Sequence, residues 1–302
     1  MRPALLDPLF SPLSSLPGIG PRLGELFARL LGQESLEECR VVDLLFHFPH
    51  GIVDRRRQPG IAHAPQGTIV TVTGRVDRHQ PPPTARSMIF VTPDGERSMN
   101  TYLGACVELG PEDVEESVVA EAKVTYFEGY LWDPPRAKDA IRDCARIAHA
   151  NGREMSMTLS DSFCVHRYRD EFLDLMRSGT IDIVFANKAE ALALYETEDF
   201  EEALSRIAKD CRLAVVTMSE EGSVILTGGE RTRVEAISIP SVVDTTGAGD
   251  LYAAGFLYGY TAGRSLADCG RLGSLAAGLV IQQVGPRPLL SLAEEARKAG
   301  LT

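Results

Sequence analysis

The chain of 302 residues lacks both the cysteine spacing of a metal centre and the long apolar run of a membrane span. Its six cysteines are scattered without a C-x-x-C pair, which is typical of reduced, mostly buried thiols in a cytoplasmic protein. No run approaches the ~18–20 apolar residues that cross a bilayer, and no signal peptide is apparent. Internal repeats and low-complexity tracts are also missing. The sequence therefore predicts a globular cytoplasmic protein with no membrane partner.

Basic charge is scarce in most of the chain. Residues 1–83 contain nine arginines, no lysine and eight acidic residues, a balance of +1, whereas the remainder carries −12. An acidic body argues against general affinity for nucleic acid, and the near-neutral front offers no compensating basic face. The length fits one large α/β domain with a small appendage.

A Walker loop is also absent, because no GK[ST] follows a glycine-rich loop. The heptad DTTGAGD, from Asp244 to Asp250, offers another way to hold a phosphate. Its small residues let backbone N–H groups approach an anion, and the helix pattern after it adds a positive dipole end. A carboxylate there is suited to take a proton from the attacking group. The pattern GxGD by itself more often marks a helix N-cap with close packing between strand and helix. The full heptad, which lies between the strand-like residues 236–243 and a helix pattern, favours the phosphate site instead.

The chain from residue 87 onward alternates strand patterns with helix patterns. The predicted strands are 87–92, 124–128, 154–159, 181–186, 213–218, 223–227 and 233–236. The predicted helices are 112–121, 135–151, 167–178, 188–194, 200–210 and 250–262. This alternation predicts a three-layer α/β domain with a mostly parallel sheet.

Five separated stretches resemble the PfkB/ribokinase family of ATP-dependent sugar and nucleoside kinases. They read VTPDGERSMNTYLGA, YFEGYLWDPP, MTLSDSFCV, FANKAEALALY and VVDTTGAGDLYAAGFLYG. The similarity covers about residues 84–302 and is greatest to the adenosine-kinase-like bacterial branch. It implies a ribokinase-like fold and transfer of the γ-phosphoryl group of ATP to a hydroxymethyl group of a nucleoside or sugar.

The resemblance also implies roles for residues of the heptad. Asp250 would be the general base, and the amides of Gly247, Ala248 and Gly249 would form an anion hole for the phosphoryl group in transit. Asp244 and Thr246 would contribute to a site for a monovalent cation such as K⁺, with structural capping as an equally good interpretation.

Three further elements match the nucleotide side of this family. Asn187 and Glu190 form an N-x-x-E pair suited to water-mediated Mg²⁺, although spacing alone favours an ordinary helix N-terminus. Thr217 and Gly222, in the loop TMSEEG, are expected to contact ATP, and the motif by itself is an ordinary hairpin turn. Ser274, expected just before a helix, falls near an adenine-side position.

The first 83 residues resemble the extreme N-terminus of RecG, the branch-migration DNA helicase. A turn at residues 16–20 resembles a helix–hairpin–helix, although a tight turn between packed helices is the better interpretation. Residues 68–76 alternate like the first strand of an oligonucleotide-binding barrel. The chain thus divides into a RecG-like segment, 1–83, and a kinase-like domain, 84–302, that lacks the family's N-terminal third.

Because that third holds the sugar-gripping G-G-x-x-x-N element, we expect the chain to be poorly active or inactive in this fused form. The alternatives are a DNA-binding module derived from the helicase and a fusion product without activity. The sequence leaves open a homodimer.

Overall fold

The computed structural model describes residues 12–15, 85–92 and 94–301, and the chain divides into the units 1–54 and 55–302. In the first unit only Pro12–Ser15 is described, with a short 3₁₀-helix, η2 (Leu13–Ser15). The RecG-like features of the turn at 16–20 and the strand at 68–76 lie outside the described residues and stay predictions.

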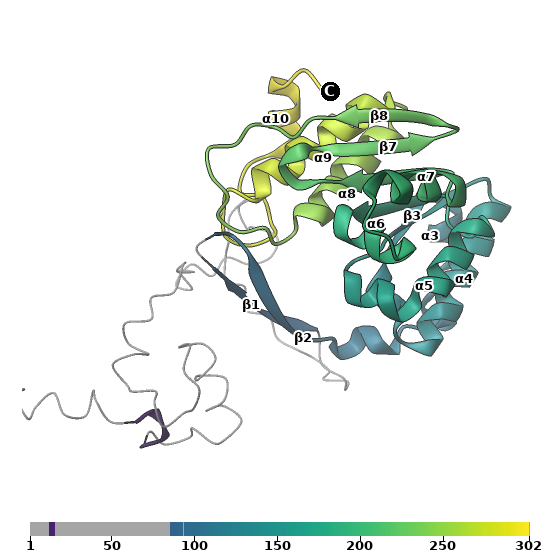
Figure 1. Ribbon diagram of the computed structural model, residues 1–302. Coiled ribbons are helices and arrows are strands. Elements are labelled where there is room, and N and C mark those ends of the chain that lie inside the picture. Colours follow the sequence, from purple (N-terminus) through teal and green to yellow (C-terminus); the bar gives the residue numbers. More distant parts are fainter. Residues whose placement is uncertain (1–11, 16–84, 93, 302) are drawn as a thin grey trace, which may run out of the picture. The chain divides into compact units, whose positions relative to one another are not determined.

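A six-stranded sheet forms the centre of the second unit (Figure 1). Its strands, in spatial and chain order, are β3 (Val124–Glu128), β4 (Glu154–Thr158), β5 (Ile183–Asn187), β6 (Leu213–Thr217), β7 (Ser223–Thr227) and β8 (Glu230–Val234). β3 to β6 run parallel, whereas β7 and β8 pair antiparallel to their neighbours. The predicted mostly parallel sheet is confirmed.

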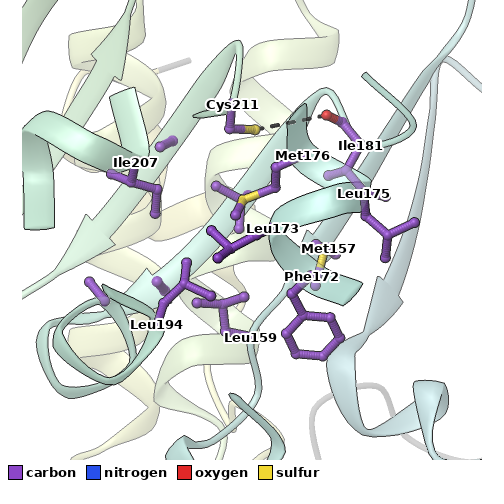
Figure 2. Packing of buried hydrophobic residues seen from close by; sticks show 14 of the residues in the cluster. Met157, Leu159, Phe172, Leu173, Leu175, Met176, Ile181, Leu194, Ile207 and Cys211 are labelled. Atoms are coloured by element: carbon purple, nitrogen blue, oxygen red, sulfur yellow. Dashed lines mark hydrogen bonds between the residues drawn. The ribbon is translucent and has the colours of Figure 1, made fainter. Parts of the chain in front are cut away.

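Helices cover both faces of the sheet, because the side chains of its central strands alternate between two apolar clusters. On β5, Val184 and Ala186 enter one cluster, while Ile183 and Phe185 enter the other. Figure 2 shows part of the first cluster, including Phe172 and Leu194. This cluster is formed with α4 (Pro135–Ala150), α5 (Ser162–Arg177), α6 (Lys188–Tyr195) and α7 (Phe200–Asp210). The second is formed with α8 (Ala248–Thr261) and α9 (Leu266–Val280).

The remaining elements are short or stand apart from the sheet. A separate antiparallel ribbon consists of β1 (Arg86–Val91) and β2 (Arg97–Tyr102). The short elements are η4 (Gly104–Glu108), η5 (Pro111–Asp113), α3 (Glu116–Glu121), η6 (Gly129–Trp132), η7 (Ser219–Glu221) and α10 (Leu292–Lys298). No helix among residues 12–15, 85–92 and 94–301 is long and apolar enough to cross a membrane.

The prediction of a strand at 236–243 is wrong, since residues 235–243 contain no strand. Their backbone groups find other partners: the Ile237 amide donates to Ser274 Oγ at 3.1 Å, and the Val243 amide donates to the Ile281 carbonyl at 2.8 Å. The last strand, β8, instead starts at Glu230, directly after the two-glycine turn at Gly228 and Gly229, both of positive φ.

Two helix predictions also need correction. Residues 112–121 are split between η5 and α3. α5 begins at Ser162, earlier than predicted, because the Asp161 side chain caps it by accepting the Cys164 amide at 2.8 Å.

Candidate active site

The four parallel strands end along one edge of the sheet, where open α/β sheets usually bind ligands. Glu128 at the end of β3 lies beside Thr158 at the end of β4. Asn187 at the end of β5 lies beside Thr217 at the end of β6. The structure therefore places the predicted nucleotide-side residues Asn187 and Thr217 next to each other.

α8 brings the heptad to this same edge. Its last turn is fixed at the opposite edge, where Tyr260 Oη donates to Glu154 Oε1 at 3.0 Å and the Thr261 carbonyl accepts from Lys123 Nζ at 2.6 Å. Glu154 and Lys123 lie at the start of β4 and just before β3. Fourteen residues of helix span about 21 Å, whereas a five-residue strand spans about 17 Å, so the helix reaches the other edge and its first turn with Asp250 faces the carboxyl ends of the strands.

The turn before α8 requires a glycine. Gly247 caps the helix with φ +82°, and a Cβ there would lie 2.7 Å from Pro286 Cβ. Gly249 is different, because its φ is ordinary and a Cβ would meet no atom within 4 Å. The backbone at Gly249 therefore faces open space, as a surface that receives a ligand does.

The amides of this turn are not equally available. The Ala248 amide donates to the Thr245 carbonyl at 3.2 Å, so its predicted place in the anion hole is already taken by the protein. The amides of Gly247 and Gly249 have no protein acceptor within the part of the chain that the structure describes. An exposed carboxylate follows at Asp250, in the third position of the helix.

Asp244 and Thr246 are buried behind the turn. The Asp244 carboxylate accepts the Thr246 amide at 2.9 Å and the Gly285 amide at 2.8 Å, and so joins the heptad to the segment after α9. These bonds show a structural role. Thr246 Oγ1 is buried and makes no well-formed hydrogen bond among the described residues. Its hydroxyl nevertheless helps, against the effect of burial, to lower the pKa of the Asp244 carboxyl, so the two side chains interact and the cation site stays a prediction.

Arg97 belongs to this site although the sequence analysis did not single it out. Its Nη1 donates to Thr245 Oγ1 at 2.8 Å, and the amide and hydroxyl of Thr245 both bond the Gly95 carbonyl at 3.0 Å. These contacts fix the tip of the β1–β2 ribbon to the heptad. They also place a guanidinium beside the turn of the heptad, where it could pair with an anion. The only sequence signal was the stretch VTPDGERSMNTYLGA, in which this arginine follows a tight Asp-Gly turn.

Asn187 and Glu190 form a capping box at the start of α6. The Glu190 carboxylate accepts the Asn187 amide at 2.9 Å and Asn187 Nδ2 at 2.7 Å, while Asn187 Oδ1 accepts the Glu190 amide at 2.9 Å. The pKa of Glu190 is raised to about 7, mainly by burial and also by the charges of Asp161 and Glu128, with the hydrogen bond from the Asn187 amide opposing them. A carboxyl with this pKa is ready to lose its proton to a cation.

Glu128 is a second group that sequence reasoning missed. Its carboxylate accepts Tyr126 Oη at 2.7 Å and Ser160 Oγ at 3.1 Å. Burial raises the pKa of Glu128, and the charge of Asp250 raises it again, so the two carboxyl groups interact across the site. Ser160 lies at a positive φ of 67° directly after β4. A carboxyl at the end of a buried strand was the available signal.

The other predicted nucleotide contacts are divided. Thr217 ends β6, and its hydroxyl donates to the Ala186 carbonyl at 3.4 Å. Gly222, at φ +85°, closes the loop to β7, and a Cβ there would lie 2.1 Å from the Val234 carbonyl oxygen. Gly222 is buried, and its amide and carbonyl bond Ser219 and Met218 within the loop, which supports a structural role. Half-buried Thr217 at the strand end stays a candidate nucleotide contact. Ser274 lies inside α9 and not before a helix, because Ser265 caps that helix; its hydroxyl bonds Glu235 and Ile237, which supports a structural role.

No three His, Cys, Asp or Glu side chains gather to hold a metal directly in the ranges that the structure covers. The chemistry at the sheet edge is therefore an arrangement of backbone donors, one arginine and separate carboxyl groups. The fold and this edge define an α/β protein in which open backbone donors lie beside a carboxylate, an arrangement suited to an anion.

The chain belongs to the pfkB family of carbohydrate kinases, whose family model matches residues 71–292. It is 30% identical to the adenosine kinase of Saccharomyces cerevisiae over 205 residues, which is 63% of this chain. The match spans 59% of the yeast protein, so the chain covers less than two thirds of that relative's length.

Two solved structures are similar over most of the described body. A probable sugar kinase from Rhizobium etli is 75% identical with a TM-score of 0.73, covering 77% of this chain and 70% of that one. The adenosine kinase from Sinorhizobium meliloti is 74% identical with a TM-score of 0.72, covering 76% and 70%. These matches confirm the ribokinase-like fold.

Proposed function

We propose that this chain carries the phosphate-transferring half of an ATP-dependent kinase that acts on a hydroxymethyl group of a nucleoside or sugar. The observation that supports it most is the turn from Gly247 to Asp250, where open backbone donors and a carboxylate meet at the carboxyl edge of the sheet. The names of the relatives, adenosine kinase and probable sugar kinase, support a nucleoside or sugar as the acceptor.

The transfer needs few parts. The acceptor hydroxyl gives its proton to Asp250 as its oxygen forms a bond to the γ-phosphorus, and the bond between this phosphorus and the bridging oxygen of ADP breaks. Charge on the phosphoryl oxygens is met by the amides of Gly247 and Gly249 and by Arg97. Donors that are already in place favour the transition state over the ground state.

Two cations fit residues of this site. Asn187 and Glu190 would hold Mg²⁺ through water, because Glu190 offers carboxylate oxygens. Contact through water fits the absence, among the described residues, of a cluster of three His, Cys, Asp or Glu side chains that could bind the ion directly. When bound there, Mg²⁺ would neutralise part of the negative charge of the ATP phosphates. A monovalent cation such as K⁺ would contact Thr246 Oγ1, which makes no well-formed hydrogen bond among the described residues, and there it would steady the turn behind the phosphate.

The acceptor side has fewer candidates. Glu128 presents a carboxylate whose pKa is raised by burial and by the charge of Asp250. Phe163 and Tyr130 are exposed aromatic rings on the elements that follow β4 and β3. Phe163 is 81% exposed, which suits stacking on a nucleobase. Because the chain spans only part of its relatives, we expect transfer to be slow without a further polypeptide, and slow ATP hydrolysis to be the residual activity.

The test is a screen of the full chain with Mg·ATP against adenosine, cytidine, ribose and fructose, with product detected by mass spectrometry. Asp250→Asn is the control, because it removes the base and keeps the fold. Phosphorylated product that depends on Asp250 supports the proposal. ADP release or product formation that is the same in Asp250→Asn contradicts it.

A further inference from the structure

A cavity of about 510 Å³ lies at the amino edge of the sheet, away from the candidate active site. Three turns line it: residues 176–182 before β5, residues 208–212 before β6, and the hairpin turn 228–229 between β7 and β8. β5 and β6 each span about 17 Å, so the cavity is at the opposite ends of the strands that carry Asn187 and Thr217. Its volume is within the range of small-molecule pockets, roughly 300–1,000 Å³.

Three basic side chains line this cavity in a protein whose net charge is −11. Arg177 Nη2 donates to Asp210 Oδ2 at 3.0 Å. Arg212 Nε lies 3.6 Å from Asp182 Oδ1, and the same guanidinium pairs with the glutamate that begins β4. Lys209 is exposed, and its neighbour Asp210 pairs with Arg177 instead. Three cations therefore face two carboxylates in the lining, and Lys209 supplies the excess positive charge.

The two carboxylates of the lining hold the arginines in place without using all their donors. Asp210 accepts Tyr195 Oη at 3.0 Å in addition to Arg177, and Asp182 accepts a backbone amide of β4 at 2.8 Å. Each carboxylate is thus shared with a group outside the cavity. Because a guanidinium has five N–H donors, Arg177 and Arg212 both keep donors for an anion.

The backbone of the cavity is also open to a ligand. The amides of Gly228 and Gly229 have no acceptor in the part of the chain that the structure describes. A Cβ at either glycine, or at Gly179 on the facing turn, would meet no atom within 4 Å. The lining includes the buried side chains of Met176 and Cys211 as well, which give it an apolar part (Figure 2). Open amides beside cations form a cradle for an oxyanion.

We propose that this cavity binds a small phosphate monoester and is a ligand site separate from the phosphate-binding turn of the heptad. A phosphate monoester offers three acceptor oxygens and up to two charges, which match two arginine forks, a lysine and free amides better than a single carboxylate would. None of the described lining residues is aromatic, so a nucleobase would find no ring to stack on. The ligand class is therefore a sugar phosphate.

The test is a calorimetric titration of the full chain with ribose 5-phosphate, without nucleotide or Mg²⁺. We expect Lys209→Gln to weaken binding roughly tenfold, since it removes one charge-assisted contact from an exposed position. Lys298→Gln on α10 is the matched control and should have no effect, because that lysine is 70% exposed and pairs with Glu295 of its own helix. Amide exchange should become slower in residues 176–182, 208–212 and 227–230.

Four results would overturn the proposal. The first is no heat at about 1 mM ribose 5-phosphate, and the second is equal affinity in Lys209→Gln and the native chain. The third is slower exchange confined to residues 244–250, which would place the ligand at the heptad. The fourth is equally tight binding of succinate or inorganic phosphate, because the cavity would then not select a phosphate monoester. None of these measurements involves nucleotide, so their failure is distinct from failure of the proposed kinase function.

Discussion

Replacing Gly249 by alanine should make the protein more stable and its nucleotide binding weaker. Gly249 is in the first turn of α8 with an ordinary φ, and a Cβ there would meet nothing within 4 Å. The change should therefore stabilise the helix by about 0.5–1 kcal/mol. For a unit of this size we expect the melting temperature to rise by roughly 1–4 °C.

The same methyl group would fill the space in which the phosphate approaches the Gly249 amide. Losing one charge-assisted hydrogen bond costs about 1.5–3 kcal/mol, so the affinity for Mg·ATP should fall roughly ten- to hundredfold. Calorimetric titration and thermal melting of the same samples give both quantities. Gly152→Ala is the control: φ is +65° and the space is open, so stability should fall while affinity stays constant. Unchanged ATP affinity in Gly249→Ala would refute the assignment of this face to the phosphate.

Three further outcomes are expected. Asp250→Asn should lower any transfer rate by about 10²–10⁴-fold and leave ATP affinity within a few-fold, and a variant with half the activity would make Asp250 only a helix residue. The pKa of Glu190 is raised from 4.5 to about 7, so its contribution to the free energy of unfolding is full below pH 4.5 and is lost as the pH rises through 7. The Mg²⁺-dependent affinity for ATP should change in the opposite direction and rise roughly tenfold from pH 6 to 8, and Glu190→Gln should remove this rise. Gly222→Ala should lower the free energy of unfolding by more than about 3 kcal/mol, because its Cβ would overlap the Val234 carbonyl, and a denaturant midpoint equal to that of the native chain would contradict this.

The sequence predicted most of the sheet because its strands have strong local patterns. β3, β7 and α7 begin and end at the predicted residues, since each is a short apolar or amphipathic run between clear breaks. Only the end of α9 was predicted, as a helix after Ser274, because the glycines of its first half lower helix propensity. One reason for those glycines is tertiary: a Cβ on Gly273 would lie 2.8 Å from the Tyr252 carbonyl of α8.

The candidate site was predictable only where its parts are close in sequence. The heptad is one such part, and the Asn187–Glu190 pair is another. Arg97 was not, because its bond to Thr245 joins residues 148 positions apart. The use of the Ala248 amide within the turn was also hidden, since it depends on the backbone path and not on residue types.

The most direct test of the central claim is a calorimetric titration of the full chain with ATP, in the presence and absence of Mg²⁺. The claim is that the turn at Gly247–Asp250, Arg97 and the Asn187–Glu190 pair together form a nucleotide phosphate site. It predicts measurable heat with Mg²⁺, weaker binding without it, and nearly unchanged affinity in Asp250→Asn. No heat from a sample that melts cooperatively would contradict it.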